Sequence, residues 1–260
     1  MKEEIRSPAV AGSFYPDDKD ELEAMIEKYL SLAKEMKAPG RLRGLVVPHA
    51  GYVYSGPVAA YGYKALSKIR YKKAIILGPS HYAMFLGAAD SGYSSWETPL
   101  GPVKTKTKSG GIIKVLPQAH GPEHCIEVQL PFLQKIYGGK IEVWPLICGD
   151  VEPADLAKEV QKELDEDTVV IASSDLSHYN DYETAKRIDS VANIAVPALD
   201  IRRFEAEGDA CGKTAILTLM HIAKKKGWVG RMLDYRNSGD TAGPKDSVVG
   251  YGCYAFYEGR

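Results

Sequence analysis

Long apolar runs are missing from this chain, since none approaches the roughly 18 residues that a membrane-spanning helix requires. The opening segment MKEEIRSPAVAGSFYP also lacks the apolar centre of a secretory signal peptide. Neither sign of charge dominates, because 33 Lys and Arg are balanced by 34 Asp and Glu, which gives a net charge of −1. We therefore expect a soluble cytoplasmic protein with no membrane partner and without the basic field that attracts nucleic acid.

Cysteine is scarce, and its four residues are scattered at Cys125, Cys148, Cys211 and Cys253. The absence of any CxxC pair argues against a disulfide framework and against a structural zinc knot, and it fits a reducing compartment. Cys211 stands before Gly212 at an expected helix start, a position that lowers the pKa of a thiol. A buried structural cysteine is the simpler interpretation of the same residue.

Internal repeats, low-complexity tracts and a linker that would divide the chain are also missing. Short runs of β-forming residues alternate with amphipathic segments of roughly ten residues or more, which predicts an α/β fold. We expect one domain over residues 1–260, with a mostly parallel central sheet flanked by helices. The expected strands are 44–47, 74–77, 141–147, a run from 169, and 248–257. The expected helices are 17–38, 57–66, 123–137 with a kink at Pro131, 153–164, 181–199 and 212–225.

Three expected strands end in loops that carry histidine. His49 follows the first in PHAGY, His81 follows the second in GPSHY, and Asp175 and His178 follow the third in SSDLSHY. Ligands in open α/β sheets gather at the carboxyl ends of the strands. The pattern therefore predicts one shared site, although any one of these histidines alone is more often an ordinary loop residue, and Asp175 is as easily a turn or helix cap.

Neutral imidazoles with a carboxylate are ligands for a first-row divalent metal, and two His with one carboxylate are associated with non-heme Fe(II). We expect His49, His81 and His178 to bind metal, with Fe(II) first and Zn or Mn as alternatives. Iron would support ring opening of a catechol-like substrate, with His178 as the base and Asp175 orienting it. A zinc hydrolase uses similar ligands, so that alternative stays open.

Further residues are candidates for the same site. His124 and Glu127 lie three apart in an expected helix, on one face, although a helix-start residue and a solvated face are the simpler interpretations. Four tyrosines next to the proposed ligands could line a pocket for a small aromatic molecule or a peptide, although the chain has 16 tyrosines and chance proximity competes. These are Tyr52, Tyr54, Tyr82 and Tyr179. The oligomeric state is left open.

Several blocks together resemble the MEMO protein family (mediator of ErbB2-driven cell motility), also described in prokaryotes as AmmeMemoRadiSam system protein B. The blocks are SPAVAGSFYP, PHAGYVYSGPVAA, LGPSHY, EHCIEVQLPFLQ, SSDLSHY and SVVGY. The resemblance implies a fold similar to the class III extradiol dioxygenases, which use non-heme Fe(II). Animal members are linked to iron or copper binding, redox signalling and recognition of phosphotyrosine peptides. A non-catalytic module that binds such ligands is thus an alternative to an enzyme.

The resemblance matches His49 and His81 to metal ligands, and Asp175 with His178 to the remaining site residues.

The animal-type cysteine ligand is the point of departure. The resemblance places it in the loop before the last strand, near Thr241, where this chain has no cysteine. The third ligand is then open between Asp240, Asp175, Glu127 and water. Oxygen ligands favour Fe(II), Mn or Zn over Cu(I).

Overall fold

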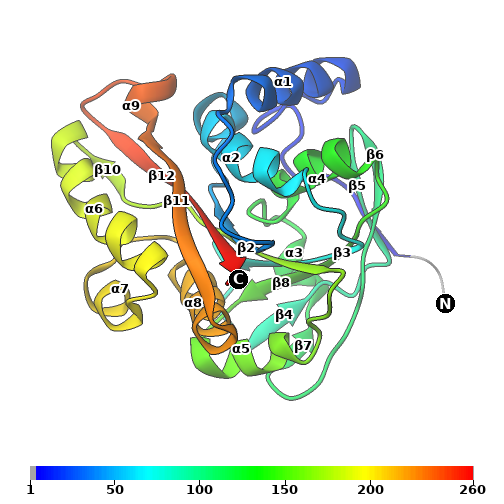
Figure 1. The fold of residues 1–260 in the computed structure, drawn as a ribbon. Helices are drawn as coiled ribbons and strands as arrows, with labels where there is room; N and C mark the ends of the chain where they lie inside the picture. Colours follow the sequence, from blue (N-terminus) through cyan, green and yellow to red (C-terminus); the bar gives the residue numbers. More distant parts are fainter. Residues whose placement is uncertain (1–3, 260) are drawn as a thin grey trace.

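The computed structural model describes residues 4–259 and places a nine-stranded sheet at the centre of the molecule (Figure 1). The sheet order is β10-β12-β2-β9-β3-β8-β4-β7, with β11 paired to β12. The four adjacent strands in the middle are parallel. They are β2 (Leu42–Val47), β9 (Thr168–Ser173), β3 (Lys73–Pro79) and β8 (Glu142–Cys148). The expected α/β fold with a parallel centre is therefore confirmed.

Antiparallel pairings extend the sheet on both sides. The long strand β12 (Val248–Glu258) runs antiparallel to β2 and also pairs with β11 (Trp228–Asn237) and β10 (His178–Asn180). On the other side, β4 (Ala88–Asp90) is antiparallel to β8, and β7 (Ile113–Val115) follows it. A separate three-stranded sheet contains β1 (Ile5–Arg6), β5 (Ser95–Thr98) and β6 (Gly101–Lys104).

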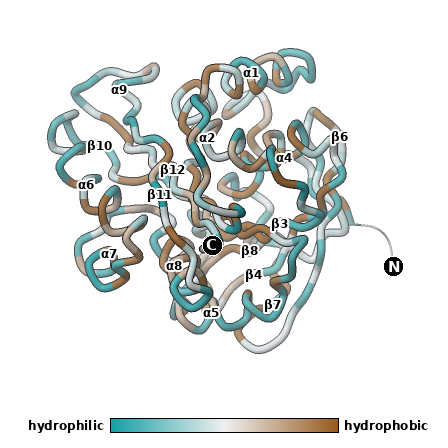
Figure 2. Tube along the Cα trace, viewed as in Figure 1, coloured by the Kyte–Doolittle hydropathy of each residue, from teal (hydrophilic) through white to brown (hydrophobic). Residues whose placement is uncertain are grey.

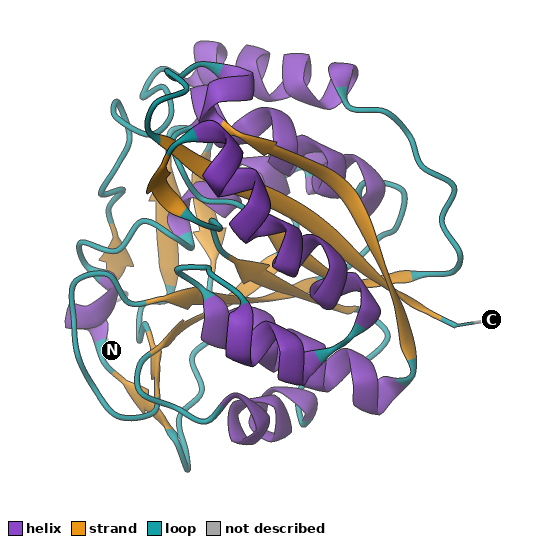
Figure 3. Ribbon diagram, turned by 90° about the vertical axis from the view of Figure 1, so that its left-hand side faces the viewer, coloured by secondary structure: helices purple, strands orange, loops and turns teal. Residues whose placement is uncertain are grey.

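Helices cover both faces of the central sheet (Figure 3). Successive strand residues point to opposite faces, so Leu45 joins one apolar core while Val46 joins the other. The central strands are mostly brown in Figure 2, whereas the outer turns of the helices are largely teal. The first face carries α1 (Lys19–Leu32), α2 (Tyr52–Leu66) and α4 (Leu130–Tyr137). The second carries α5 (Pro153–Gln161), α6 (Tyr182–Ala198), α7 (Ile201–Glu207) and α8 (Lys213–Lys226).

The segment 123–137 differs from the kinked helix that its sequence predicts. A loop comes first, then the 3-10 turn η1 (Glu127–Gln129), and α4 begins only at Leu130. Pro131 thus lies in the first turn of α4, where a proline removes no intrahelical hydrogen bond. The loop before η1 is free to turn its side chains toward the edge of the sheet.

Other boundaries also shift. α2 begins at Tyr52 and includes Pro57, which was expected to start it. α7 was not among the expected helices; Asp200 caps its start by accepting from the Arg203 amide. Two further short helices are α3 (Pro117–His120) and α9 (Ser238–Thr241). None of the helices in the described range 4–259 is both long and apolar enough to cross a bilayer.

Candidate metal centre

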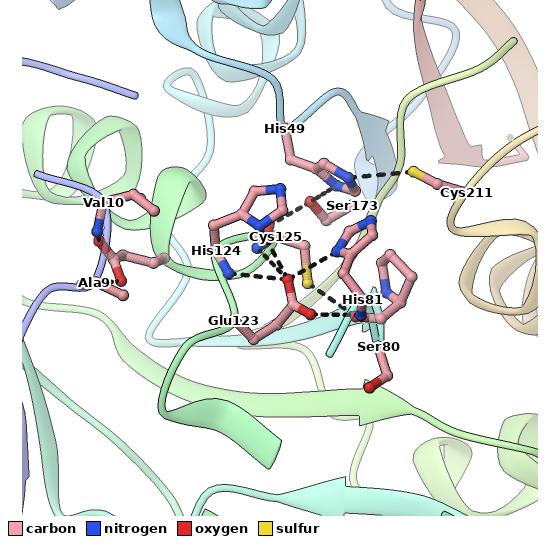
Figure 4. Close-up of polar contacts among 12 residues, drawn as sticks. Ala9, Val10, His49, Ser80, His81, Glu123, His124, Cys125, Ser173 and Cys211 are labelled. Atoms are coloured by element: carbon pink, nitrogen blue, oxygen red, sulfur yellow. Dashed lines mark hydrogen bonds and ion pairs between the residues drawn. The ribbon is translucent and has the colours of Figure 1, made fainter. Parts of the chain in front are cut away.

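Sheet register brings the first two histidine loops together. Val47 at the end of β2 pairs with Ser173 at the end of β9, and Leu77 of β3 pairs with Ala172. The loops carrying His49 and His81 therefore leave the same edge of the sheet side by side. A third histidine, His124, reaches this edge from the loop before η1 (Figure 4).

Three imidazoles meet at this point: His49, His81 and His124. Each offers a nitrogen that lies within 4.8 Å of the nitrogens offered by the other two. Metal-to-nitrogen bonds are roughly 2.1 Å long, so a small movement of the side chains would bring all three onto one ion.

Hydrogen bonds fix the tautomer of His49. The Ser173 hydroxyl donates its one hydrogen to the Cys125 carbonyl, at 2.6 Å. Its oxygen lies 3.0 Å from Nδ1 of His49, so Nδ1 must carry the hydrogen in that contact. Gln129 Nε2 also donates to the Ser173 oxygen, at 2.7 Å, while its own Oε1 accepts from the Tyr63 hydroxyl. Nε2 of His49 is left with a free lone pair, as a metal ligand requires.

A buried carboxylate fixes the tautomer of His81 in the same way. Glu123 Oε1 lies 2.9 Å from Nδ1 of His81, and a carboxylate can only accept, so Nδ1 carries the hydrogen. Glu123 also accepts from the backbone amides of His81, His124 and Cys125, which binds the two loops together. Carboxylate to histidine to metal is a common arrangement in metalloproteins, because the carboxylate orients the ring and raises its basicity.

Of the three imidazoles, the ring of His124 has the fewest hydrogen-bond partners. Its Nδ1 lies 3.3 Å from Glu123 Oε1, yet it makes no hydrogen bond and is buried. The ring stacks on His81 at a centroid distance of 4.8 Å and packs against Phe14 at 4.7 Å. A buried imidazole nitrogen without a hydrogen-bond partner is costly in a folded protein. A metal ion bound by the cluster would account for this unpartnered ring.

The protonation states suit metal binding. Burial, reinforced by the neighbouring His81, lowers the pKa of His49 to about 3. Burial also lowers the pKa of His124 to about 4, with His49 adding to the effect. The hydrogen bond to Glu123 raises the pKa of His81. Two of the three rings are therefore neutral at neutral pH, which is the form that binds metal.

A cysteine lies beside the cluster, although not in the loop near Thr241. Cys211, in the loop before α8, places its Sγ 3.2 Å from Nε2 of His49. Burial and the nearby Asp175 raise the pKa of its thiol to about 12, so the expectation of a low thiol pKa at this helix start is wrong. A thiol can donate to the free Nε2, and a metal ion would replace that proton and favour the thiolate.

Asp175 and His178 have separate positions. Asp175 Oδ1 accepts from the backbone amide of His49 at 2.7 Å, so this carboxylate holds the histidine loop in place. His178 opens β10 with its side chain half-buried, and it is outside the group of three imidazoles.

Glu127 and Asp240 form hydrogen bonds with other parts of the protein. Glu127 is fully buried, and its oxygens accept from Arg6, from the Tyr15 hydroxyl and from two backbone amides. Asp240 caps α9 with one oxygen and accepts from the Tyr182 hydroxyl with the other. Both carboxylates therefore have structural partners that a metal ion would have to displace.

The four tyrosines divide into two groups. Tyr52 is buried in the apolar core, where its hydroxyl donates to the Val128 carbonyl, so it does not line an open pocket. The other three are exposed, and the Tyr82 ring lies 6.4 Å from the rings of both His81 and His124. The remaining two are Tyr54 and Tyr179.

Sequence reasoning missed the residues that orient the imidazoles. Glu123 precedes His124 directly, and that adjacency of a carboxylate to a candidate ligand was a usable signal. Ser173 and Gln129 gave no such signal, because Ser173 contacts His49 across 124 positions of the chain and Gln129 contacts Ser173 across 44.

The fold and the site together define an α/β protein with a three-histidine cluster suited to a metal ion at the carboxyl edge of its parallel strands. A family model described as Memo-like protein matches residues 6–255. The chain belongs to this family, which confirms the resemblance seen in its sequence blocks.

Archaeal relatives match over nearly their whole length. A MEMO1 family protein of Nitrosopumilus maritimus is 37% identical over 277 residues, covering 97% of this chain and 99% of the relative. One from Thermoplasma acidophilum is 38% identical, covering 95% and 96%. One from Methanopyrus kandleri is 36% identical, covering 98% and 99%.

Proposed function

We propose that this protein binds one divalent first-row metal ion through His49, His81 and His124, and that it uses the ion in redox chemistry on a small molecule. The observation that carries the proposal is the pair of fixed tautomers. Ser173 and Glu123 each accept a hydrogen bond from Nδ1 of a histidine, so that in the neutral rings Nε2 is the nitrogen left to bind an ion.

Iron(II) is the ion we propose, with zinc or manganese as alternatives. Imidazole nitrogens suit iron and zinc, while manganese prefers oxygen donors, which the cluster does not supply. Cys211 is a candidate fourth ligand, and a thiolate would favour iron or zinc further. Bound iron would supply electron transfer and a site for oxygen. A reducing cytoplasm, which would keep this thiol free, is the compartment we propose.

A cavity next to the cluster is the proposed place for the substrate. It has a volume of about 530 Å³ and runs beside Ser80, Phe85, Cys148 and Cys211. Asp150 is the one charged residue among those that line it in the described structure, and no Lys or Arg contributes. This lining favours a neutral, partly aromatic molecule over an anion.

His178 keeps its proposed role as the base. It is outside the group of three imidazoles, so it stays free to accept and return a proton near the edge of the sheet. Asp175 supports this chemistry from a different position than expected, since it holds the backbone at His49.

Two alternatives come from specific features. Three histidines with an open position are also the ligand set of some zinc hydrolases, so zinc in the native protein would favour hydrolysis. The exposed ring of Tyr82 beside His81 and His124 favours a module that binds a peptide without chemistry, the phosphotyrosine type included.

Metal content tests the proposal. The protein, its single His→Ala variants at 49, 81, 124 and 178, and a matched control, His221→Ala on α8, would be purified without oxygen and analysed for metals. We expect one equivalent of iron in the wild type, in the control and in His178→Ala, with loss in the other three variants. Stoichiometric metal in His124→Ala, or none in the wild type after anaerobic loading with Fe(II), would contradict the proposed ligand set.

Oxygen uptake then separates an enzyme from a binding module. Iron-loaded protein would be mixed with a panel of catechols, and uptake would be followed against the control variant. We expect substrate-dependent uptake that His178→Ala lowers without changing iron content. Full iron occupancy with no uptake, together with binding of a tyrosine peptide, would favour the module.

A further inference from the structure

A second cavity lies at the opposite end of β2 from His49. It has a volume of about 600 Å³, within the usual range for a small-molecule site. Residues 33–41, which we call the strap, line it on one side, and the last turns of α2 line it on another. Apolar residues of its lining include Leu42, Tyr61, Ala65, Leu233 and Tyr257.

The mouth of this cavity is strongly cationic. Among the described residues that line it, five carry positive charge, while Glu35 alone carries negative charge. The five are Lys34, Arg41, Lys64, Lys68 and Arg70. The cavity beside the histidine cluster has no cation in its lining, so the two sites differ sharply in the ligands they favour.

Most of these cations have no carboxylate partner. Within residues 4–259, Lys34, Lys64 and Arg70 make no ion pair within 4.0 Å. Arg41 donates to the Glu166 carbonyl at 2.6 Å and to the Tyr71 hydroxyl at 3.2 Å, and its ion pair with the 80% exposed Glu166 side chain, at 3.6 Å, is weak. The positive charge at the mouth is therefore largely uncompensated by the protein.

We propose that this cavity binds an amphipathic anion, with an apolar body inside and one phosphate or carboxylate group at the mouth. Apolar surface stabilises a hydrocarbon or ring by removing it from water, while lysine and arginine hold the head group through charge-assisted hydrogen bonds. The proposal uses no residue of the histidine cluster and does not depend on the proposed function.

Two of the lining cations contact the strap. Lys68 Nζ bonds Glu35 at 2.7 Å, and Lys64 Nζ donates to the Ala33 carbonyl at 2.7 Å. The Lys64 contact joins the strap to α2, and the Lys68 contact joins it to the turn that follows α2. Glu35 thus occupies a lysine that the ligand needs, so this carboxylate acts as an internal competitor for the anion.

Calorimetry with the full chain tests the site, using octyl phosphate at submicellar concentration against inorganic phosphate and 1-octanol. We expect octyl phosphate to bind at least tenfold more tightly than either fragment. Lys64→Ala and Arg70→Ala should each weaken binding about two- to fivefold, in keeping with single partly exposed charges. Glu35→Gln should strengthen binding by a similar factor, because it removes the competitor.

Further variants separate binding in the cavity from attraction to the surface. Ala65→Trp should abolish octyl phosphate binding by filling the cavity, whereas Lys225→Ala, at an exposed position near the end of α8, should leave it unchanged. Unaltered thermal unfolding and metal content would show that each variant is folded. Equal affinity for inorganic phosphate, or an unchanged affinity in Ala65→Trp, would overturn the proposal.

The source of the anion is a separate arm of the experiment. Sedimentation with phosphatidylcholine vesicles containing phosphatidic acid would show whether the cavity binds the head group of a lipid that remains in the vesicle. Cosedimentation that Ala65→Trp removes supports a lipid source, and octyl phosphate binding without cosedimentation supports a soluble metabolite. Cosedimentation that persists in Ala65→Trp counts against the cavity.

Discussion

At the scale of single residues, the site depends on side chains that never touch a ligand themselves. Glu123 is 1% exposed, and its two oxygens accept from the His81 ring and from three backbone amides. Those hydrogen bonds, with the one from the His81 ring the strongest, outweigh the cost of burial and lower the pKa of Glu123 to about 2. This carboxylate is therefore ionised wherever the protein is folded under ordinary conditions.

The substitution Glu123→Gln tests that role. Glutamine has one acceptor oxygen in place of two, so the orientation of His81 should be lost in part. We expect metal affinity to fall by roughly 10- to 100-fold, the usual effect of losing such a partner. Competition with a chromophoric chelator would measure it, with exposed Glu97→Gln as the matched control. Equal affinities in the two variants would show that Glu123 does not orient the ligand.

At the scale of elements, Asp189 on α6 joins two strands at the edge of the sheet. Its Oδ1 accepts from the Ser177 amide at 3.0 Å, just before β10, and its Oδ2 accepts from the Tyr235 hydroxyl of β11 at 2.8 Å. Burial raises the pKa of this carboxyl above its ordinary value. The hydrogen bonds stabilise the fold, while ionisation of the buried group opposes them.

We expect Asp189→Ala to lower the free energy of unfolding by about 2 kcal/mol, because one buried donor and one partly buried donor lose their acceptor. The loss should depend on pH. The folded state holds the Asp189 proton to higher pH than the unfolded chain, so the wild-type advantage is greatest below about pH 4 and shrinks as pH rises through the raised pKa. Urea unfolding of both proteins at several pH values would measure it. An advantage that grows with pH would contradict the assignment.

The elements also show how far sequence could predict this site. His49 and His81 were predictable, because each directly follows an apolar run that reads as a buried strand. His124 was predicted as a further candidate for the site, but on a helix, since EHCIEVQLPFLQ has helical spacing and nothing local shows that the helix starts at Leu130. Cys211 and His49 are 162 positions apart, and only the packing of the loop before α8 on the sheet edge brings them together.

At the scale of the whole molecule, the beginning of the described chain is fastened to its middle. Arg6 and Glu127 form an ion pair at 2.6 Å with both side chains almost fully buried. Arg6 also donates to the backbone carbonyls of His120 and Glu123, next to the histidine cluster. The segment before α1 thus supports the loop that carries His124.

The substitution Arg6→Ala should destabilise the protein by about 3–5 kcal/mol, because Glu127 would be left as a buried charge without its cation. Exposed Arg203, which pairs with Glu207 on α7, provides the matched control, and its replacement by Ala should cost less than about 0.5 kcal/mol. Chemical denaturation of both variants would compare them. Similar losses in the two would show that the buried pair contributes little.

The candidate ligands His49, His81, His124 and Cys211 belong to stretches spread over more than half of the polypeptide, and no short peptide contains two of them in binding geometry. An ion bound there would bridge these stretches at the carboxyl edge of the sheet in the native structure, and it would be released when the chain unfolds. Through mass action, saturating metal should raise the melting temperature. On heating, the ion should then be released in the same transition in which the sheet unfolds.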